Sequence, residues 1–230
     1  MTAKTGAPRR LIVGISGASG VIYGIRLLEV LRGYPALETH LVLTKPAERT
    51  IVEETSYRVA DVKVMASVVH TITDIGASIA SGSFRTIGMV VAPCSIHTVS
   101  AIAYCLTDNL LTRAADVVLK EGRKLVLVVR ETPLHTGHLK SMLAASEAGA
   151  VILPPVPAFY NQPKTLEQVI DHTVGRVLDR FDIEHDLSPR WGENLSEGAS
   201  TAPPGASERP SEASPQRRIA RAKAAPETRT

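Results

Sequence analysis

The chain has 230 residues, 44% of them hydrophobic, and a formal net charge of +3 at pH 7. This is enough apolar material for one substantial core, and the charge is too small to favour a nucleic-acid-binding protein. No apolar segment approaches the ~20 residues of a membrane span, and the N-terminus lacks the apolar core of a signal peptide. We therefore expect a cytoplasmic protein that engages neither membranes nor nucleic acid. Its two cysteines, Cys94 and Cys105, are expected to be small core residues in a reducing compartment.

The composition changes only near the C-terminus. From Gly192 onward the chain is rich in Ser, Ala, Pro, Glu and Arg, and Leu195 and Ile219 are its only large aliphatic residues. Two such residues are too few to offset the entropy of ordering this stretch. We predict a flexible N-terminus over 1–8, one folded domain over 9–192 and a disordered tail over 193–230. The basic run Arg217–Lys223 is interpreted as solvated rather than as a nucleic-acid-binding or lipid-binding site.

The first element is an apolar run, Arg10–Ile15, that leads through the small residues Ser16–Gly20 into a helical stripe containing Ile22 and Ile25. A strand, a turn almost without side chains and a helix start together favour a bound phosphate. The glycine spacing differs from the dinucleotide fingerprint. The next strand, Glu38–Leu43, is also followed by Thr44-Lys45-Pro46, which supplies no acid for a ribose. A mononucleotide is therefore favoured over NAD.

Further elements alternate along the chain. Continuous apolar strands are predicted over 10–15, 40–43, 87–91, 125–129 and 150–153. Helices are predicted over 98–106, 110–121 and 136–148, with Gly122 and Gly149 as C-terminal stops, and from the capping box Thr165–Gln168 to Phe181. This alternation predicts an α/β fold with a single doubly wound parallel sheet, Rossmann-like or flavodoxin-like, that binds ligands at the carboxyl ends of its strands.

Those carboxyl ends are polar. They are followed, in chain order, by Ser16 and Ser19, by Thr44 and Lys45, by Pro93–Thr98, by Arg130–Pro133 and by Pro154–Tyr160. Helix capping explains any single turn equally well. The five turns together indicate a binding site along one edge of the sheet.

At this point the chain resembles the flavin prenyltransferases of the UbiX type, also described as the small subunit of phenolic acid or polyprenyl-hydroxybenzoate decarboxylases. The resemblance covers about residues 9–192 and excludes the tail. It rests on a series of blocks in the same order: Gly14–Gly20, Ala80–Phe84, Pro93–Ser95, Asn109–Val117, Leu119–Glu121, Arg130–Pro133, Gly149–Pro155, Phe159–Tyr160 and Pro189–Trp191.

The resemblance implies that the protein joins a dimethylallyl unit from dimethylallyl monophosphate to N5 and C6 of reduced FMN. The prenylated FMN would serve a UbiD-type decarboxylase in ubiquinone biosynthesis or aromatic acid breakdown. The family is implied to form homo-oligomers, typically dodecamers, with active sites at subunit contacts. The implied FMN-binding residues are Gly17, Ala18, Ser19, Thr44, Ser95, Ile96, His97, Thr98 and Arg130, and the implied prenyl phosphate-binding residues are Ser19, Lys120, Arg130, Glu131, Tyr160 and Arg176.

The chemistry of these residue types suits the reaction. Phosphate leaves the allylic carbon with growing negative charge, which Lys120 and Arg176 could neutralise. Arg130 can bind phosphate oxygens with two N–H groups, and Tyr160 can donate one hydrogen bond. No Asp-rich motif is present, so no metal is predicted.

The predicted catalytic residues are Ser19, Glu54, Lys120, Glu131 and Trp191. Glu54 matches the family's glutamate and is a candidate acid or base, although a solvated helix residue is the alternative. Glu131 is expected to orient Arg130 and Lys120. Trp191 would cover the site or simply pack, and Ile75 stands where some relatives carry a second tryptophan.

Other functions remain open. The fold and the flavin site would also suit an FMN-dependent decarboxylase acting on peptidyl cysteine, or a non-catalytic FMN carrier subunit; a second phosphate clamp favours the prenyltransferase over both. DNA binding through the tail is a distant alternative. His135 and His138 lack a third metal ligand, and Gly14–Gly17 is not the G-x-S-x-G motif of hydrolases.

Overall fold

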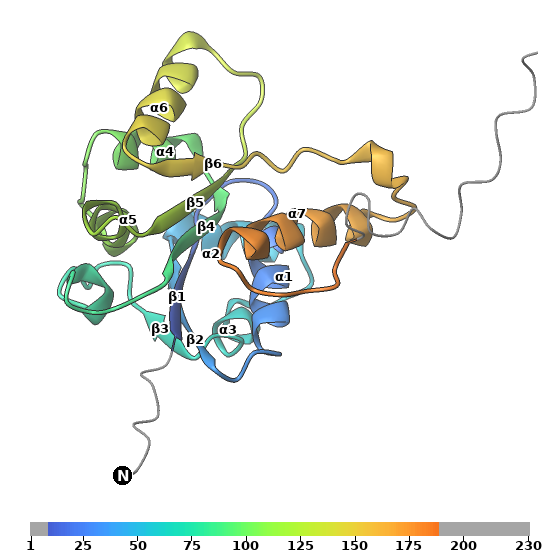
Figure 1. Cartoon of the computed structure of the whole chain (residues 1–230), viewed down its shortest axis with the longest axis horizontal. Helices are drawn as coiled ribbons and strands as arrows, with labels where there is room; N and C mark the ends of the chain where they lie inside the picture. Colours follow the sequence, from blue (N-terminus) through green and yellow to red (C-terminus); the bar gives the residue numbers. More distant parts are fainter. Residues whose placement is uncertain (1–8, 189–230) are drawn as a thin grey trace, which may run out of the picture. The chain divides into compact units, whose positions relative to one another are not determined.

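The computed structural model describes residues 9–188, which form a six-stranded sheet covered by helices on both faces (Figure 1). The strand order is β3-β2-β1-β4-β5-β6, and every neighbouring pair is parallel. This is the strand order of doubly wound nucleotide-binding folds. The strands are β1 (Arg9–Ile15), β2 (Leu37–Leu43), β3 (Val68–His70), β4 (Gly88–Cys94), β5 (Lys124–Val129) and β6 (Ala150–Ile152).

The helices divide between two hydrophobic clusters, one on each face of the sheet. On one face Leu11 and Val13 of β1 pack with Ile25 and Val174 from α1 and α7. On the other face Ile12 packs in a cluster with residues of α4 and α5. The predicted doubly wound α/β fold is therefore confirmed. The helices are α1 (Ile22–Leu31), α2 (Lys45–Glu54), α3 (Val59–Lys63), α4 (Ile96–Ala103), α5 (Leu110–Lys120), α6 (Thr136–Glu147) and α7 (Leu166–Arg180), with 3-10 turns at Ser78–Ala80 and Phe159–Asn161.

Several predicted boundaries differ from the observed ones. Strand β4 continues to Cys94, three residues past its predicted end, and α4 begins at Ile96 rather than at residue 98. The cause is Ser95, whose hydroxyl accepts the Thr98 N–H and so starts the helix earlier. The predictions missed α2, α3 and the short edge strand β3. The predicted C-terminal ends of two helices are confirmed, because Gly122 and Gly149 adopt positive φ values after α5 and α6.

The cysteines differ from each other. Cys94 lies in β4 and is fully buried, and this burial raises the pKa of its thiol. Cys105 is exposed just beyond α4, so its prediction as a core residue was wrong. Its φ of 57° ends the helix without the glycine that would have signalled the turn.

The expectation about membrane spans can be compared with the structure, whereas the predictions for both ends of the chain cannot. No helix within residues 9–188 is long and apolar enough to cross a membrane. The predictions for 1–8, for Trp191 and for 193–230 lie outside the described residues.

Candidate functional site

A cavity of about 560 Å³ lies at the carboxyl edge of the sheet, where β1, β2, β4 and β5 end. Its volume is within the usual range for small-molecule and cofactor sites. The lining comes from turns far apart in sequence that the parallel strands bring to one edge. The lining residues are Ser16, Gly17, Thr44, Lys45, Pro46, Ile72, Thr73, Ser95, Ile96, His97, Thr98, Asn109, Leu111, Thr112 and Glu131.

The N-termini of α2, α4 and α5 all open into this cavity, and each is capped by a lining residue. The Thr44 hydroxyl accepts from Ala47 N–H at 3.2 Å, and the Ser95 hydroxyl accepts from Thr98 N–H at 3.3 Å. The Asn109 side-chain oxygen accepts from Thr112 N–H at 3.1 Å. Three helix N-termini give the cavity a positive field that suits an anionic ligand such as a nucleotide phosphate.

Gly17 brings the first turn against the start of α2. A Cβ at this position would lie 2.2 Å from the Cβ of Pro46, so a larger residue would push the two walls of the cavity apart. The glycine therefore keeps the turn after β1 in the position from which its backbone faces the ligand.

Most of the predicted flavin-binding residues meet at this cavity. Of the predicted flavin-binding set, Gly17, Thr44, Ser95, Ile96, His97 and Thr98 line it, and Glu131, which was predicted to contact the prenyl phosphate, lines it as well. Ala18 and Ser19 continue the first turn, and the Arg130 N–H donates to the Cys94 carbonyl at 3.0 Å beside the turn that precedes α4. Burial raises the pKa of Tyr23 in α1, and the positive charge of Arg130 opposes this effect.

The sequence predictions did not include every lining residue. Ile72, Thr73, Asn109, Leu111 and Thr112 were not proposed as site residues. Asn109 had a usable signal, because it stands directly before the apolar face of a predicted helix, where a capping residue is expected. Ile72 and Thr73 follow the missed strand β3 and had no such signal.

Glu54 lies at the last position of α2, and its carboxylate accepts the Gly20 N–H at 2.7 Å. The side chain thus holds the far end of the turn that contains Ser19. The residue is exposed in the described chain and borders a second hollow, of about 600 Å³, between α1 and α7. The structure therefore gives it a position next to Ser19, although not within a closed pocket.

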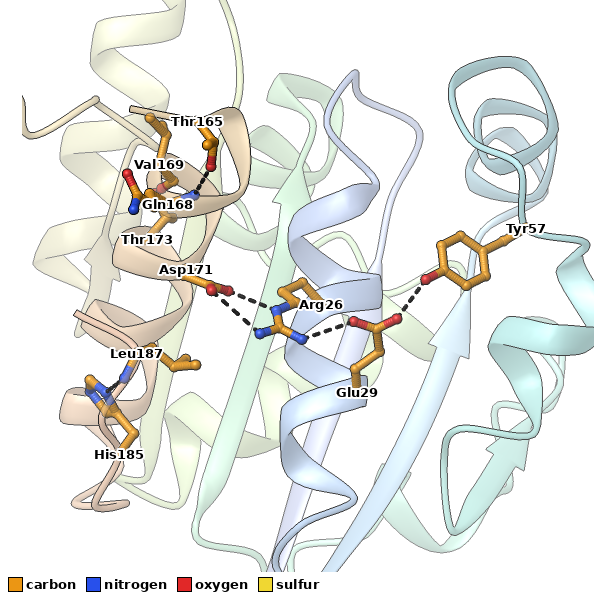
Figure 2. A network of polar contacts seen from close by, with 10 residues as sticks. All are labelled: Arg26, Glu29, Tyr57, Thr165, Gln168, Val169, Asp171, Thr173, His185 and Leu187. Carbon is orange, nitrogen blue, oxygen red and sulfur yellow. Dashed lines mark hydrogen bonds and ion pairs between the residues drawn. The ribbon is translucent and has the colours of Figure 1, made fainter. Parts of the chain in front are cut away.

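The hollow beside Glu54 is flanked by a polar network that joins three segments (Figure 2). Arg26 of α1 bonds Asp171 of α7 and Glu29 of its own helix, and the Glu29 carboxylate accepts the Tyr57 hydroxyl at 2.6 Å. The network fixes α7 against α1.

Lys120 is far from this cavity in the same chain. It is the last residue of α5, whose first turn lines the cavity, so about 15 Å of helix separates the two ends. Lys120 is exposed and lies 3.3 Å from Glu121, which in turn abuts Gly82. One chain therefore does not bring Lys120 together with Ser19 and Arg130.

Tyr160 and Arg176 are also outside the cavity lining and are exposed. The Tyr160 hydroxyl lies 3.4 Å from Nε2 of His172 on α7, and Arg176 follows one turn later, where it contacts Asp179 at 3.5 Å. Burial lowers the pKa of His172, and the charge of Arg176 lowers it further. Tyr160, His172 and Arg176 thus form a second group of polar side chains, outside the cavity and on or beside α7.

Candidate metal ligands are few. The His135 and His138 rings lie 3.6 Å apart, but within residues 9–188 no group of three or more His, Cys, Asp or Glu side chains could hold a metal ion.

Comparison with known proteins agrees with this geometry. A family model described as Flavoprotein matches residues 2–180. The protein named flavin prenyltransferase UbiX of Salmonella typhimurium is 60% identical over 185 residues, which cover 80% of this chain and 98% of that protein.

Among solved structures, those of UbiX-type proteins are also similar to this chain. A structure of AnUbiX (PadA1) in complex with FMN and dimethylallyl pyrophosphate has 50% identity and a TM-score of 0.79, covering 80% of this chain and 98% of that one. A dodecameric FMN-dependent UbiX-like decarboxylase from Escherichia coli O157:H7 has 53% identity and a TM-score of 0.78, covering 79% and 98%. The FMN-dependent cysteine decarboxylase TvaF matches with only 18% identity and a TM-score of 0.51, which shows a common fold alone.

Proposed function

Because the chain belongs to the flavin prenyltransferases of the UbiX type, we propose that it joins the dimethylallyl unit of dimethylallyl monophosphate to N5 and C6 of reduced FMN. It is an enzyme of the transferase class that uses FMN. The single observation that carries the proposal is the cavity at the carboxyl edge, where three helix N-termini and the Gly17 turn converge.

The residues of this cavity fit FMN. Its volume suits a mononucleotide, and the capped N-termini of α2, α4 and α5 supply N–H groups and positive potential for a phosphate. The apolar side chains of Ile96 and Leu111 suit the faces of an aromatic ring. We propose that FMN contacts Gly17, Ala18, Ser19, Thr44, Ser95, Ile96, His97, Thr98 and Arg130.

Prenyl transfer requires a cationic site for the departing phosphate. The bond between the allylic carbon and the phosphate oxygen breaks with both electrons on oxygen, so a lysine and two arginines lower the barrier by stabilising that charge. We propose Lys120, Arg130 and Arg176 for this task, with Tyr160 donating one hydrogen bond, Ser19 next to both substrates and Glu131 orienting Arg130 and Lys120. Glu54 and Trp191 complete the proposed catalytic set.

The distance of Lys120 from the cavity is consistent with a site built by several subunits. Tyr160 and Arg176 are likewise exposed and lie outside the lining, so a neighbouring copy can supply them. We propose a homo-oligomer, and a dodecamer by analogy with the Escherichia coli O157:H7 relative. Each cavity would then be closed by cations from other copies.

The product would pass to a UbiD-type decarboxylase. A non-catalytic FMN carrier subunit is the alternative, because the same cavity would serve it. A carrier would have no use for a second set of phosphate-binding residues. A peptidyl-cysteine decarboxylase is disfavoured for the same reason.

Mass spectrometry of the bound flavin tests the proposal. Anaerobic incubation of the full chain with reduced FMN and dimethylallyl monophosphate should give a flavin heavier by one C5H8 unit. Parallel reactions with dimethylallyl diphosphate and with oxidised FMN are the matched controls and should give less product. Recovery of unmodified FMN from folded, flavin-loaded protein would contradict catalysis and favour the carrier.

A further inference from the structure

Ser16 is the first residue after β1 and is only 1% exposed. Its hydroxyl donates to the Pro93 carbonyl at 3.0 Å and accepts the Ser95 N–H at 2.8 Å. The Ser16 N–H donates to the same Pro93 carbonyl at 3.2 Å. One buried side chain therefore links the end of β1 to both sides of the turn that follows β4.

The turn after β4 is held from its other side by β5. The Arg130 N–H donates to the Cys94 carbonyl at 3.0 Å. Beyond the turn, the Ser95 hydroxyl caps α4 by accepting the Thr98 N–H, and it lies 3.0 Å from the Thr98 hydroxyl. The position of the α4 N-terminus, which opens into the cavity, thus depends on the hydroxyl of Ser16.

Ser16 and Ser95, which this hydroxyl joins, each stand directly before proposed FMN contacts. Gly17–Ser19 follow Ser16, and Ile96–Thr98 follow Ser95. A change to alanine would leave the Pro93 carbonyl with the Ser16 N–H as donor, but it would remove the partner of the Ser95 N–H. A donor left unpaired in a buried setting is costly, so the turn would shift to find another partner.

We propose that Ser16 is a positioning residue for prenyl transfer: its hydroxyl keeps the first turn and the turn before α4 in the register that aligns FMN with the prenyl phosphate. This inference rests on the proposed function for the identity of the two substrates. A displacement of about 1 Å between reacting groups costs roughly 100-fold in rate, so the register matters more for turnover than for prenyl phosphate binding.

The test compares Ser16→Ala with Ser141→Ala in the full chain. Ser141 is also buried, at 7% exposure, and its hydroxyl accepts from Ser100 at 3.0 Å between α4 and α6, outside the cavity lining. We expect Ser16→Ala to raise the Kd for FMN about 10-fold, from the loss of one hydrogen bond to a buried donor. Its kcat should fall about 30-fold with KM for the prenyl phosphate within about 3-fold. Ser141→Ala should keep the wild-type Kd and kcat even if its thermal stability falls.

A second pair of variants keeps the test decisive if Ser16→Ala folds poorly. Ser16→Thr retains the hydroxyl and should restore kcat, whereas Ser16→Val has the shape of threonine without the hydroxyl and should not. Equal kcat in these two variants would overturn the inference, as would wild-type Kd and kcat in Ser16→Ala. Absence of product from the wild-type protein would instead overturn the proposed function, and the FMN Kd series would still decide the role of Ser16.

Discussion

Arg26 and Asp171 join α1 to α7 through two parallel hydrogen bonds, 2.7 Å from Nε to Oδ1 and 3.3 Å from Nη2 to Oδ2 (Figure 2). Arg26 also contacts Glu29 at 3.2 Å, so one guanidinium serves two carboxylates. Helix α1 follows the turn Ser16–Gly20, which we propose contacts FMN, and α7 carries Arg176. The pair therefore ties the proposed flavin site to the helix that bears a proposed prenyl phosphate contact.

Replacing Asp171 with alanine should lower the free energy of unfolding by about 1–2 kcal/mol, because a geometrically matched arginine–carboxylate pair is lost. The side chains are 36% and 22% exposed, so solvent screening keeps the value at this modest level. Urea unfolding measures the change. Glu53→Ala is the control, because its pair with Arg49 is far more exposed, at 56% and 81%, and should contribute much less to stability. Equal losses in the two variants would contradict the structural role of the Arg26–Asp171 pair.

Gly17→Ala should weaken FMN binding by at least about 10-fold, since the added Cβ would lie 2.2 Å from the Cβ of Pro46 and must displace the first turn or α2. Flavin fluorescence titration gives the Kd. Gly122→Ala is the matched control: its φ is +63° but no atom lies within 4 Å of the added Cβ. That variant should lose about 1 kcal/mol of stability and keep the wild-type Kd. A Gly17→Ala protein with unchanged FMN affinity would show that the turn tolerates the displacement.

The central sheet could be predicted because its strands are buried on both faces. Val13 and Ile12 point to opposite faces of β1 and both are buried, which produces the continuous apolar run seen in the sequence. The edge strand β3 has no such signal, because its middle residue Val69 is 41% exposed and the strand is only three residues long. Helix α3 is also short, with five residues, and only Val62 among them is buried.

The cavity could be predicted in part, because N-cap residues and strand ends are local signals. Thr44 and Ser95 were recognised in this way. The buried bridge from Ser16 to Ser95 joins residues 79 positions apart, and no local pattern reports such a contact. Lys120 illustrates the opposite case, since the resemblance assigned it to the site while its position at the end of α5 separates it from the cavity within one chain.

Lys120→Ala should keep the wild-type Kd for FMN and lose product formation by at least about 100-fold, because it removes a cation from the departing phosphate. Lys124→Ala is the control: it removes a lysine four residues later, which pairs with Asp182 at 2.6 Å, and should keep wild-type turnover. Full activity in Lys120→Ala would remove this residue from the mechanism.

Subunit mixing tests whether Lys120 serves another copy. Lys120→Ala and Ser19→Ala proteins, each inactive alone, should regain activity when they are unfolded together and reassembled. Some sites would then combine an intact Ser19 with an intact Lys120. No gain on mixing would contradict a shared site.

Stability should fall as the pH is lowered from about 6.5, because His40 and His70 are packed together as neutral rings. Nδ1 of His40 lies 2.9 Å from Nε2 of His70, and Nε2 of His40 lies 2.6 Å from Glu38. Burial lowers the pKa of both imidazoles; Glu38 opposes this for His40, and Asp74 opposes it for His70. The unfolded chain therefore binds more protons than the folded chain between its own histidine pKa and the lowered folded values. Above about pH 6.5 the two imidazoles are neutral in both the folded and the unfolded chain, so they cause no loss of stability there.

Between the histidine pKa of the unfolded chain and the lowered pKa of the folded chain, the free energy of unfolding should change by up to about 1.4 kcal/mol per pH unit for each imidazole. Urea unfolding of the protein without flavin at pH 5.5 to 8 measures it, and this range avoids most of the carboxylate titrations. A variant with His40→Gln and His70→Gln should show a flatter profile, with His172 supplying the remainder, since burial also lowers the pKa of that imidazole. An unchanged slope in the double variant would assign the acid sensitivity to other groups.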